Sequence, residues 1–357
     1  MRAKLNRPSL ESFFNHCWYG SGFSSGLARV LLFPLSLIYR MVISLRLWAY
    51  ARGWLPSTRL PVPVIVVGNL SVGGTGKTPF TLALVRWLQD AGYKPGILSR
   101  GYGAQVNEAV PVLPDSDPRR VGDEPVLLAR RADCPVWVSR SRVEAGQQLL
   151  AFHPEVNVLV TDDGLQHYAL ARDLEIAVFD ASRGLGNRCL LPAGPLREPV
   201  SRLNRVNAVV LNGRGMTADA LEMDVPAYAM QLVGSRFCNL LDPSRTAQVT
   251  DWQDAGANVE VDTKLHALAG IGHPQRFFDH LRGLGLTVFE HAFPDHHVYQ
   301  PEDLPEGIVL MTEKDAVKCA RIVQETGRED CWYLAVDAEV GAGLKESVLL
   351  RLKKLPR

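Results

Sequence analysis

The sequence has little net charge, few aromatic residues and no closely paired cysteines. Its 357 residues carry a formal charge of +1, 8% are aromatic, and the six cysteines form no C-x-x-C pair. We therefore expect neither a disulfide framework nor a zinc site, and we expect reduced thiols. At 46% hydrophobic residues the chain is too apolar for intrinsic disorder, so a buried core in two ordinary domains is predicted.

The N-terminal region lacks an uncharged run long enough to cross a bilayer. Between Leu27 and Tyr50 the longest such run is Val30 to Tyr39, about 15 Å of helix where roughly 30 Å is needed. Residues 1–60 carry eight Lys or Arg against one acid, which leaves the body of the chain mildly acidic. These basic residues interleave with apolar ones, which favours a membrane surface over nucleic acid as the partner.

A helix over this segment would be amphipathic. Arg29, Ser36, Arg40 and Ser44 fall within an arc of about 80°, and apolar side chains fill most of the remaining circumference. Pro34 could kink such a helix. We predict an interfacial helix on the cytoplasmic side, since no cleavable signal peptide precedes it. A helix packed on the protein's own core is the alternative.

A glycine-rich loop over residues 69–76, here called the Walker loop, separates an expected strand from an expected helix. Pro61 to Gly68 is typical of a buried parallel strand, and Lys77 to Gly92 of a helix that glycine ends. Backbone N–H groups of such a loop surround phosphate oxygens, while the Lys reaches the β and γ phosphates and the following Thr can bind Mg²⁺. Serine occupies the first position of the motif, where glycine is usual, and a chance match is the alternative. The predicted nucleotide-binding residues are Ser71, Val72, Gly73, Gly74, Thr75, Gly76, Lys77 and Thr78.

Asn157 to Asp163 resembles a Walker B motif, an apolar strand that ends in paired acids. A carboxylate at this place can hold Mg²⁺, although the pair could equally cap a helix or form a turn. Strands at Gly96 to Ser99 and Cys134 to Ser139, with helical stretches between them, predict a doubly wound α/β domain. The sequence has no N/T-K-x-D element, the motif with which many P-loop proteins read a guanine base. ATP is therefore the expected nucleotide.

The second half of the chain predicts a smaller α/β domain. Strands are expected over residues 206–212, 265–271, 286–291 and 307–312, and helices over 274–284 and 315–324. Residues 227–233 and 332–340 are predicted to form a two-stranded hinge, which implies closure on the substrate. Gly270 to Gly272 lacks the third glycine of a dinucleotide-binding motif and is interpreted as a tight turn. The expected organisation is a membrane-associating segment over 1–55 as part of the first domain, a P-loop kinase domain over 56–228, the smaller lid domain over 229–340 and a C-terminal helix over 341–357.

Two exposed polar clusters have ordinary interpretations on residue type alone. Paired acids such as Asp123 and Glu124 are most often solvated, and loop histidines such as His296 and His297 are usually structural. Adjacent histidines without further spaced ligands also disfavour zinc.

Taken together, seven motifs strongly resemble the tetraacyldisaccharide 4'-kinase family, the lipid A 4'-kinases. They are GNLSVGGTGKTP (68–79), LSRGYG (98–103), VGDEP (121–125), TDDGLQH (161–167), LLPAGPLREP (190–199), FPDHH (293–297) and TEKDAVK (312–318). The resemblance implies transfer of the ATP γ-phosphate to the 4'-hydroxyl of tetraacyldisaccharide 1-phosphate. It also implies that lipid IVA forms at the cytoplasmic face of the inner membrane, with no obligate protein partner evident.

The resemblance further assigns roles to single residues. Asp123 is the implied base, His296 orients it or raises its basicity, and Lys77 neutralises charge on the transferred group. The implied Mg²⁺ ligands are Thr78, Asp162, Glu124 and Gln166, and the implied acceptor-side residues are Tyr102, Asp163, His167 and Arg197. The alternative functions are a P-loop NTPase that couples hydrolysis to metal insertion or protein maturation, and a membrane-associated scaffold.

Overall fold

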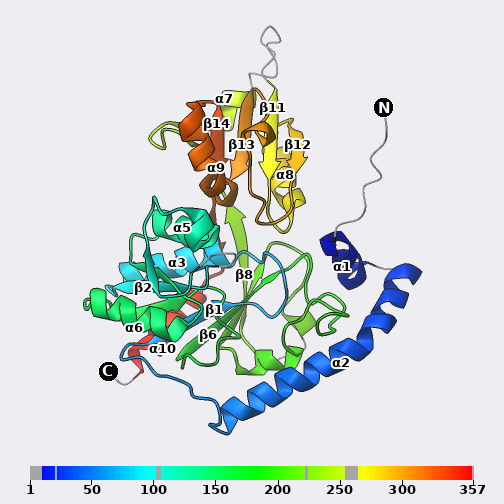
Figure 1. Ribbon diagram of the computed structural model, residues 1–357, viewed down its shortest axis with the longest axis vertical. Coiled ribbons are helices and arrows are strands. Elements are labelled where there is room, and N and C mark those ends of the chain that lie inside the picture. The colour runs from blue at the N-terminus through cyan, green and yellow to red at the C-terminus, as the bar shows by residue number, and fades with distance from the viewer. Residues whose placement is uncertain (1–9, 21, 102–105, 222–223, 254–263, 356–357) are drawn as a thin grey trace.

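The computed structural model describes residues 10–20, 22–101, 106–221, 224–253 and 264–355. These residues form two α/β units, one on each of two sheets, and a long N-terminal helix that lies along the outside of the larger unit (Figure 1). The prediction of an α/β protein with a second, smaller domain is confirmed.

The first domain is built on a nine-stranded sheet of order β15-β8-β7-β6-β1-β5-β2-β4-β3. Neighbouring strands from β8 to β4 pair in parallel, and the two edge strands pair antiparallel. The strands are β1 Val64–Gly68, β2 Pro95–Ser99, β3 Val110–Val112, β4 Val136–Val138, β5 Val158–Thr161, β6 Leu174–Asp180, β7 Ala208–Asn212, β8 Ala227–Val233 and β15 Asp337–Val340. Its helices are α3 Lys77–Asp90, α4 Pro118–Val121, α5 Asp123–Arg131, α6 Arg142–Phe152, α10 Leu344–Lys353, and the 3-10 turns η1 Val200–Arg205 and η2 Asp219–Leu221.

The inner strands of this sheet are apolar because helices or loops cover both faces. Side chains of β1 alternate between two cores: Ile65 and Val67 pack with α3 and α5, while Val64 and Val66 pack on the opposite face with α6. The carboxyl ends of β1, β5, β6 and β7 therefore meet at one edge, where ligands of doubly wound sheets bind.

The lid domain, residues 236–334, contains a six-stranded sheet of order β10-β9-β14-β13-β11-β12. Its strands are β9 Arg236–Asn239, β10 Thr246–Gln248, β11 Leu265–Ala269, β12 Phe289–Ala292, β13 Ile308–Thr312 and β14 Cys331–Leu334. Its helices are α7 Thr250–Gln253, α8 Pro274–Gly283, α9 Glu313–Thr326 and the 3-10 turn η4 Pro301–Asp303.

Two predictions about the hinge need correction. The expected strand over residues 332–340 is two strands, β14 in the lid sheet and β15 in the first sheet. The predicted boundary at residue 229 divides β8, which lies wholly in the first sheet and pairs antiparallel with β15. The chain thus crosses between the domains at residues 234–235 and 335–336.

Helices α1 (Leu10–Tyr19) and α2 (Phe23–Ala51) precede the first sheet. Helix α2 is continuous over 29 residues with Pro34 inside it, so the proline does not divide the helix. Its length and composition suffice to cross a membrane, which the longest uncharged run of the sequence did not predict. Charged residues interrupt the apolar sequence without interrupting the helix.

Candidate active site

The Walker loop joins β1 to α3 at the carboxyl edge of the first sheet. Gly73 and Gly76 have φ of +111° and +89°, in the region that favours glycine, and Gly76 caps α3. A Cβ atom at Gly76 would also collide with the side-chain amide of Asn212. The loop therefore needs glycine at these two positions, and it directs the N-terminus of α3 toward the site.

Segments distant in sequence hold this loop. Val72 donates its backbone N–H to the carbonyl of Pro195 at 2.9 Å, and the Asn212 amide donates to the carbonyl of Thr75 at 3.1 Å. The hydroxyl of Thr75 is buried and has no hydrogen-bond partner within the part of the chain that the structure describes. An unpartnered donor inside a phosphate-binding loop fits a ligand with acceptor oxygens.

The paired acids after β5 differ sharply in their surroundings. Asp162 is 1% exposed. Among the described side chains, only Thr81 donates a hydrogen bond to its carboxylate, at 3.4 Å. Burial, and then the nearby charge of Glu124, raise the pKa of Asp162. A buried carboxylate that faces a second carboxylate fits the chemistry of a divalent cation site.

Asp163 instead belongs to a cluster of cations. Its carboxylate lies 3.5 Å from Lys77 Nζ and 3.1 Å from Arg197 Nη1. Burial would raise the pKa of Asp163, but the charges of Lys77 and Arg197 outweigh it and lower that pKa. The structure thus brings together three predicted residues, Lys77, Asp163 and Arg197.

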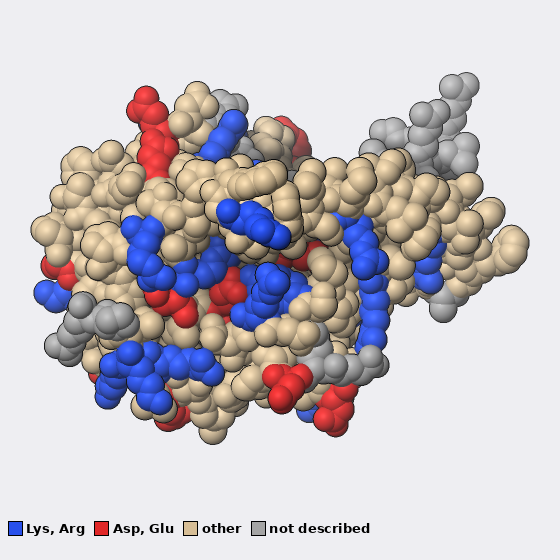
Figure 2. Space-filling model, turned by 90° about the horizontal axis from the view of Figure 1, so that it is seen from below, with Lys and Arg blue, Asp and Glu red and all other residues tan. Residues whose placement is uncertain are grey.

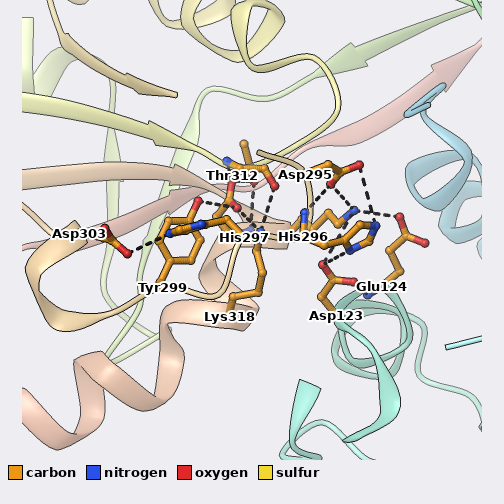
Figure 3. A network of polar contacts seen from close by, with 12 residues as sticks. Asp123, Glu124, Asp295, His296, His297, Tyr299, Asp303, Thr312 and Lys318 are labelled. Atoms are coloured by element: carbon orange, nitrogen blue, oxygen red, sulfur yellow. Dashed lines mark hydrogen bonds and ion pairs between the residues drawn. The ribbon is translucent and has the colours of Figure 1, made fainter. Parts of the chain in front are cut away.

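The predicted dyad forms across the two domains. Asp123 begins α5, His296 lies in a loop of the lid with φ +58°, and Nδ1 of the histidine lies 3.1 Å from Oδ2 of the aspartate (Figure 3). His297 points away and contacts Asp303 at 3.0 Å. The contact therefore selects His296 as the partner of Asp123.

The contact stabilises the charged forms of both partners, the carboxylate of Asp123 and the imidazolium of His296. Burial would raise the pKa of Asp123, but the hydrogen bond from His296 and the charge of Lys314 lower it to about 2. Burial would lower the pKa of His296, but the hydrogen bond to Asp123 raises it. This direction runs against the expectation that His296 raises the basicity of Asp123, because a partner that stabilises the ionised carboxylate weakens it as a base.

A lysine that sequence reasoning did not assign to the site completes this contact. Lys314 Nζ lies 3.1 Å from Glu124 Oε1 and 3.1 Å from Asp295 Oδ1. The residue stands in the motif TEKDAVK, so its sequence context was visible. Its partner Glu124 is 190 positions away in the chain, and the sequence gives no sign of this pairing.

The other predicted site residues are His167, Gln166 and Tyr102, and the first two differ in the contacts that they make. His167 accepts a hydrogen bond from the backbone N–H of Arg142 at 3.3 Å, and burial together with nearby guanidiniums lowers the pKa of His167 to about 4. The Gln166 amide donates to the Asn69 carbonyl at 3.0 Å and accepts from Arg197 at 3.4 Å, and no contact with another predicted metal ligand is seen among the described residues. Tyr102 lies outside the described residues.

A second contact joins the lid to the first domain beside the Walker loop. Arg276 of α8 lies 2.9 Å from the buried carboxylate of Asp180 at the end of β6, and 3.3 Å from the Asn212 amide oxygen. Arg183 donates to the carbonyl of Gly272 at 3.1 Å. A Cβ atom at Gly272 would come within 3.3 Å of the Gly74 nitrogen, so the predicted tight turn over residues 270–272 lies against the Walker loop.

Helix α2 attaches to the first domain along one face. Ser36 donates to the Leu190 carbonyl at 2.9 Å, Tyr39 to the Arg197 carbonyl at 3.0 Å, and Arg46 to the Gln166 carbonyl at 3.2 Å. The remaining surface of α2 is largely apolar, and the most exposed apolar side chains are Phe23 at 89%, Val30 at 70% and Leu31 at 70%. The view from below, the side on which α2 lies, shows groups of Lys and Arg beside broad uncharged surface (Figure 2). The helix is therefore compatible with membrane association.

Comparisons with known proteins identify the family of the chain. The profile of the family described as Tetraacyldisaccharide-1-P 4'-kinase matches residues 28–353. The chain is 50% identical over 332 residues to the tetraacyldisaccharide 4'-kinase of Chromobacterium violaceum, covering 92% of this chain and 95% of that one. It is 45% identical over 352 residues to the protein of the same name from Methylobacillus flagellatus, covering 97% and 98%.

A solved structure is also similar. The crystal structure of the "apo" form of LpxK from Aquifex aeolicus in complex with ATP matches with a TM-score of 0.73 and 31% identity, over 91% of this chain and 99% of that one. These matches favour a kinase over the alternative functions considered from the sequence. The chain belongs to the tetraacyldisaccharide-1-P 4'-kinase family.

Proposed function

We propose that the protein transfers the γ-phosphate of ATP to the 4'-hydroxyl of tetraacyldisaccharide 1-phosphate and so forms lipid IVA. The observation that carries this proposal is the contact of 3.1 Å between Asp123 and His296 beside the Walker loop. A group able to accept a proton thus lies on one side of the phosphate-binding loop, which is the arrangement that phosphoryl transfer to an alcohol requires.

The Walker loop and α3 bind the phosphates. Backbone N–H groups of residues 73–78 and the positive end of α3 face the anion, and the Thr75 hydroxyl is a free donor within this described segment. Lys77, now paired with Asp163, neutralises charge on the transferred group.

Thr78, Asp162 and Glu124 fit a magnesium ion. The two carboxylates lie close enough for Glu124 to raise the pKa of Asp162, while Lys77 and Arg142 lower it in part and Glu124 is paired with Lys314. Mg²⁺ bound there would neutralise negative charge on the phosphates.

The proton of the 4'-hydroxyl passes to the dyad as a unit. Asp123 already accepts a hydrogen bond from the backbone of Glu124 at 2.9 Å, which fixes its orientation on α5. Because the carboxylate alone is a weak base, the neutral imidazole of His296 is the stronger acceptor of the pair. The reaction is therefore expected to proceed faster above the pKa of His296.

Residues near the Walker loop bind the acceptor. Arg197 contacts Asp163 and is available for a charge-assisted hydrogen bond with a phosphate or hydroxyl group. His167 is neutral at physiological pH and lies beside Arg142. We include Tyr102 in this acceptor group from the family motif alone.

We propose that helix α2 holds the enzyme on the membrane surface as a peripheral or monotopic protein, on the cytoplasmic face of the inner membrane that the family resemblance implies. A helix that crossed the bilayer could not also bind the first domain from Ser36 to Arg46, because the domain is polar and folded. The helix therefore lies parallel to the surface, with its exposed apolar side chains in the interface.

The direct test supplies radiolabelled ATP with and without the glycolipid and separates the products by thin-layer chromatography. We expect a labelled lipid from the wild type and none from Lys77→Ala, since the phosphate-binding lysine is lost. Release of free phosphate at the same rate with and without glycolipid, and no labelled lipid, would instead support the NTPase alternative.

A further inference from the structure

Lys314 occupies an unfavourable place for a lysine. It is the second residue of α9, where the positive end of the helix dipole disfavours a cation, and it lies between two acidic residues of the same turn. Its side chain is only 15% exposed. A cation that is both buried and at a helix N-terminus needs strong partners, so the contacts of this lysine decide its role.

Its partners come from both domains. Glu124 and Asp123 belong to α5 of the first domain, at 3.1 and 3.9 Å, while Asp295 belongs to the same lid loop as His296, at 3.1 Å. Burial would lower the pKa of Lys314, but the three carboxylates outweigh it and raise that pKa. The three carboxylates therefore favour the charged ammonium group, and its contacts join the two halves of the dyad.

We propose that Lys314 is a positioning residue for phosphoryl transfer, which holds the Asp123 end of α5 against the His296 loop when the lid meets the first domain. This inference rests on the proposed function of the dyad. Lys314 touches both acids of α5 and the residue next to His296, so it fixes the separation of the two groups that share the proton. Without it, three carboxylates would face one histidine with no ammonium group to balance them, and they would favour the protonated form of that histidine.

The neighbouring ion pair of Arg131 with Glu313 supplies a matched control. It joins the same two helices, α5 and α9, at 2.5 Å, and Arg131 also pairs with Asp337 at 2.8 Å. Neither contact of Arg131 involves the dyad. A variant at Arg131 therefore weakens the same helix packing and leaves the charges around Asp123 in place.

The charges around the dyad set the sign of the expected pH effect. Asp123 is faced by His296 from the lid loop and by Lys314 and Lys318 from α9, and His296 is also faced by Asp295 of its own loop. The charge of Lys314 lowers the pKa of both Asp123 and His296. Its removal should therefore raise the pKa of His296 and move the acid limb of the pH profile of kcat to higher pH.

The experiment compares Lys314→Met, Lys314→Arg and Arg131→Gln with the wild type in the glycolipid assay. We expect Lys314→Met to lower kcat by about 10² and to move the acid limb upward, with KM for ATP changed little. Lys314→Arg should keep the acid limb in place and recover part of kcat, because it keeps the charge. Arg131→Gln should lose thermal stability while its kcat and acid limb remain as in the wild type.

Two results would overturn the inference: a Lys314→Met enzyme with wild-type kcat and acid limb, or the same upward shift in Arg131→Gln. A wild type that labels no lipid would refute the proposed function and not this inference. In that case NMR titration of His296 in the wild type and Lys314→Met still decides it, since a higher pKa in the variant supports the inference and an unchanged one contradicts it.

Discussion

Two polar contacts join the lid to the first domain, one on each side of the Walker loop, and they are made of different chemistry. On the β5 side the contact pairs His296 with Asp123 and Lys314 with Glu124. On the β6 side Arg276 pairs with Asp180. Histidine changes its charge near neutral pH and arginine does not, so the first contact is suited to proton transfer and the second to holding the lid at every pH.

The largest effect is expected from the contact on the β5 side. Asp123→Ala and His296→Ala should each lower kcat by about 10² or more, because the proton acceptor is lost, while the protein remains folded. The double variant should lose less than the product of the two single losses, since the residues act as a unit. Steady-state kinetics with the glycolipid measures all three, and near wild-type turnover of Asp123→Ala would disprove the assignment.

A smaller effect is expected on the β6 side. Arg276→Ala should raise KM for ATP by about tenfold and leave kcat less affected, because Arg276 and Asn212 act on the position of the Walker loop and not on the proton. Arg282→Ala is the control: it lies on the same helix and pairs with Asp279 on the exposed surface. The distinction between the two contacts would be lost if Arg276→Ala and Arg282→Ala changed KM for ATP equally, or if Arg276→Ala lowered only kcat.

The pH dependence separates the contacts further. In Asp123→Asn the carboxylate that contributes most to raising the pKa of His296 is gone, while burial and the charge of Lys314 still lower it, so that pKa should fall although Asp295 remains. NMR titration of His296 measures this shift. An unchanged pKa would mean that the hydrogen bond does not persist in solution.

The same pair affects stability in both directions of pH. The stability that the His296 side of the pair contributes is fully present below pH 6.5, and it is lost as the pH rises through the raised pKa of His296. The stability that the Asp123 side contributes is lost as the pH falls from 3.8 toward the lowered pKa of Asp123, about 2. The pair of Arg276 with Asp180 should show no such loss at alkaline pH, because arginine stays charged.

The smallest effect on turnover is expected far from both contacts. Replacing Phe23, Val30 and Leu31 of α2 by serine should reduce sedimentation with anionic vesicles by about tenfold or more, because several apolar groups leave the interface. Turnover of detergent-dispersed substrate should change little. Leu113→Ser, another exposed apolar position in the first domain, is the control and should bind vesicles as the wild type does.

Sequence patterns predicted the parts of this site that are continuous in the chain. Strand, glycine loop and helix follow one another from β1 to α3, so the Walker loop could be recognised from neighbouring residues alone. Strand β6 was missed although all of it is buried, because Glu175 and Asp180 interrupt its apolar sequence. These charges are tolerated inside the fold because Arg202 and Arg276 pair with them, and both partners are distant in sequence.

The same limit applies to the contacts between the domains. Motifs indicated that Asp123 and His296 matter, and only the folded chain shows that Lys314 and Arg276 lie on opposite sides of the Walker loop. The charge of a lysine or arginine is visible in a sequence. The carboxylate that it meets is not.

The segment LLPAGPLREP has a consequence for where the reaction takes place. Its Leu190 and Arg197 carbonyls bind α2, and its Pro195 carbonyl binds the Walker loop, so ten consecutive residues connect the membrane helix with the nucleotide. In the proposed interfacial position of α2, this segment would fix the height of the phosphate donor above the lipid headgroups. A sugar whose acyl chains remain in the bilayer would then reach the donor without leaving the membrane, and a water-soluble sugar would gain nothing from this placement.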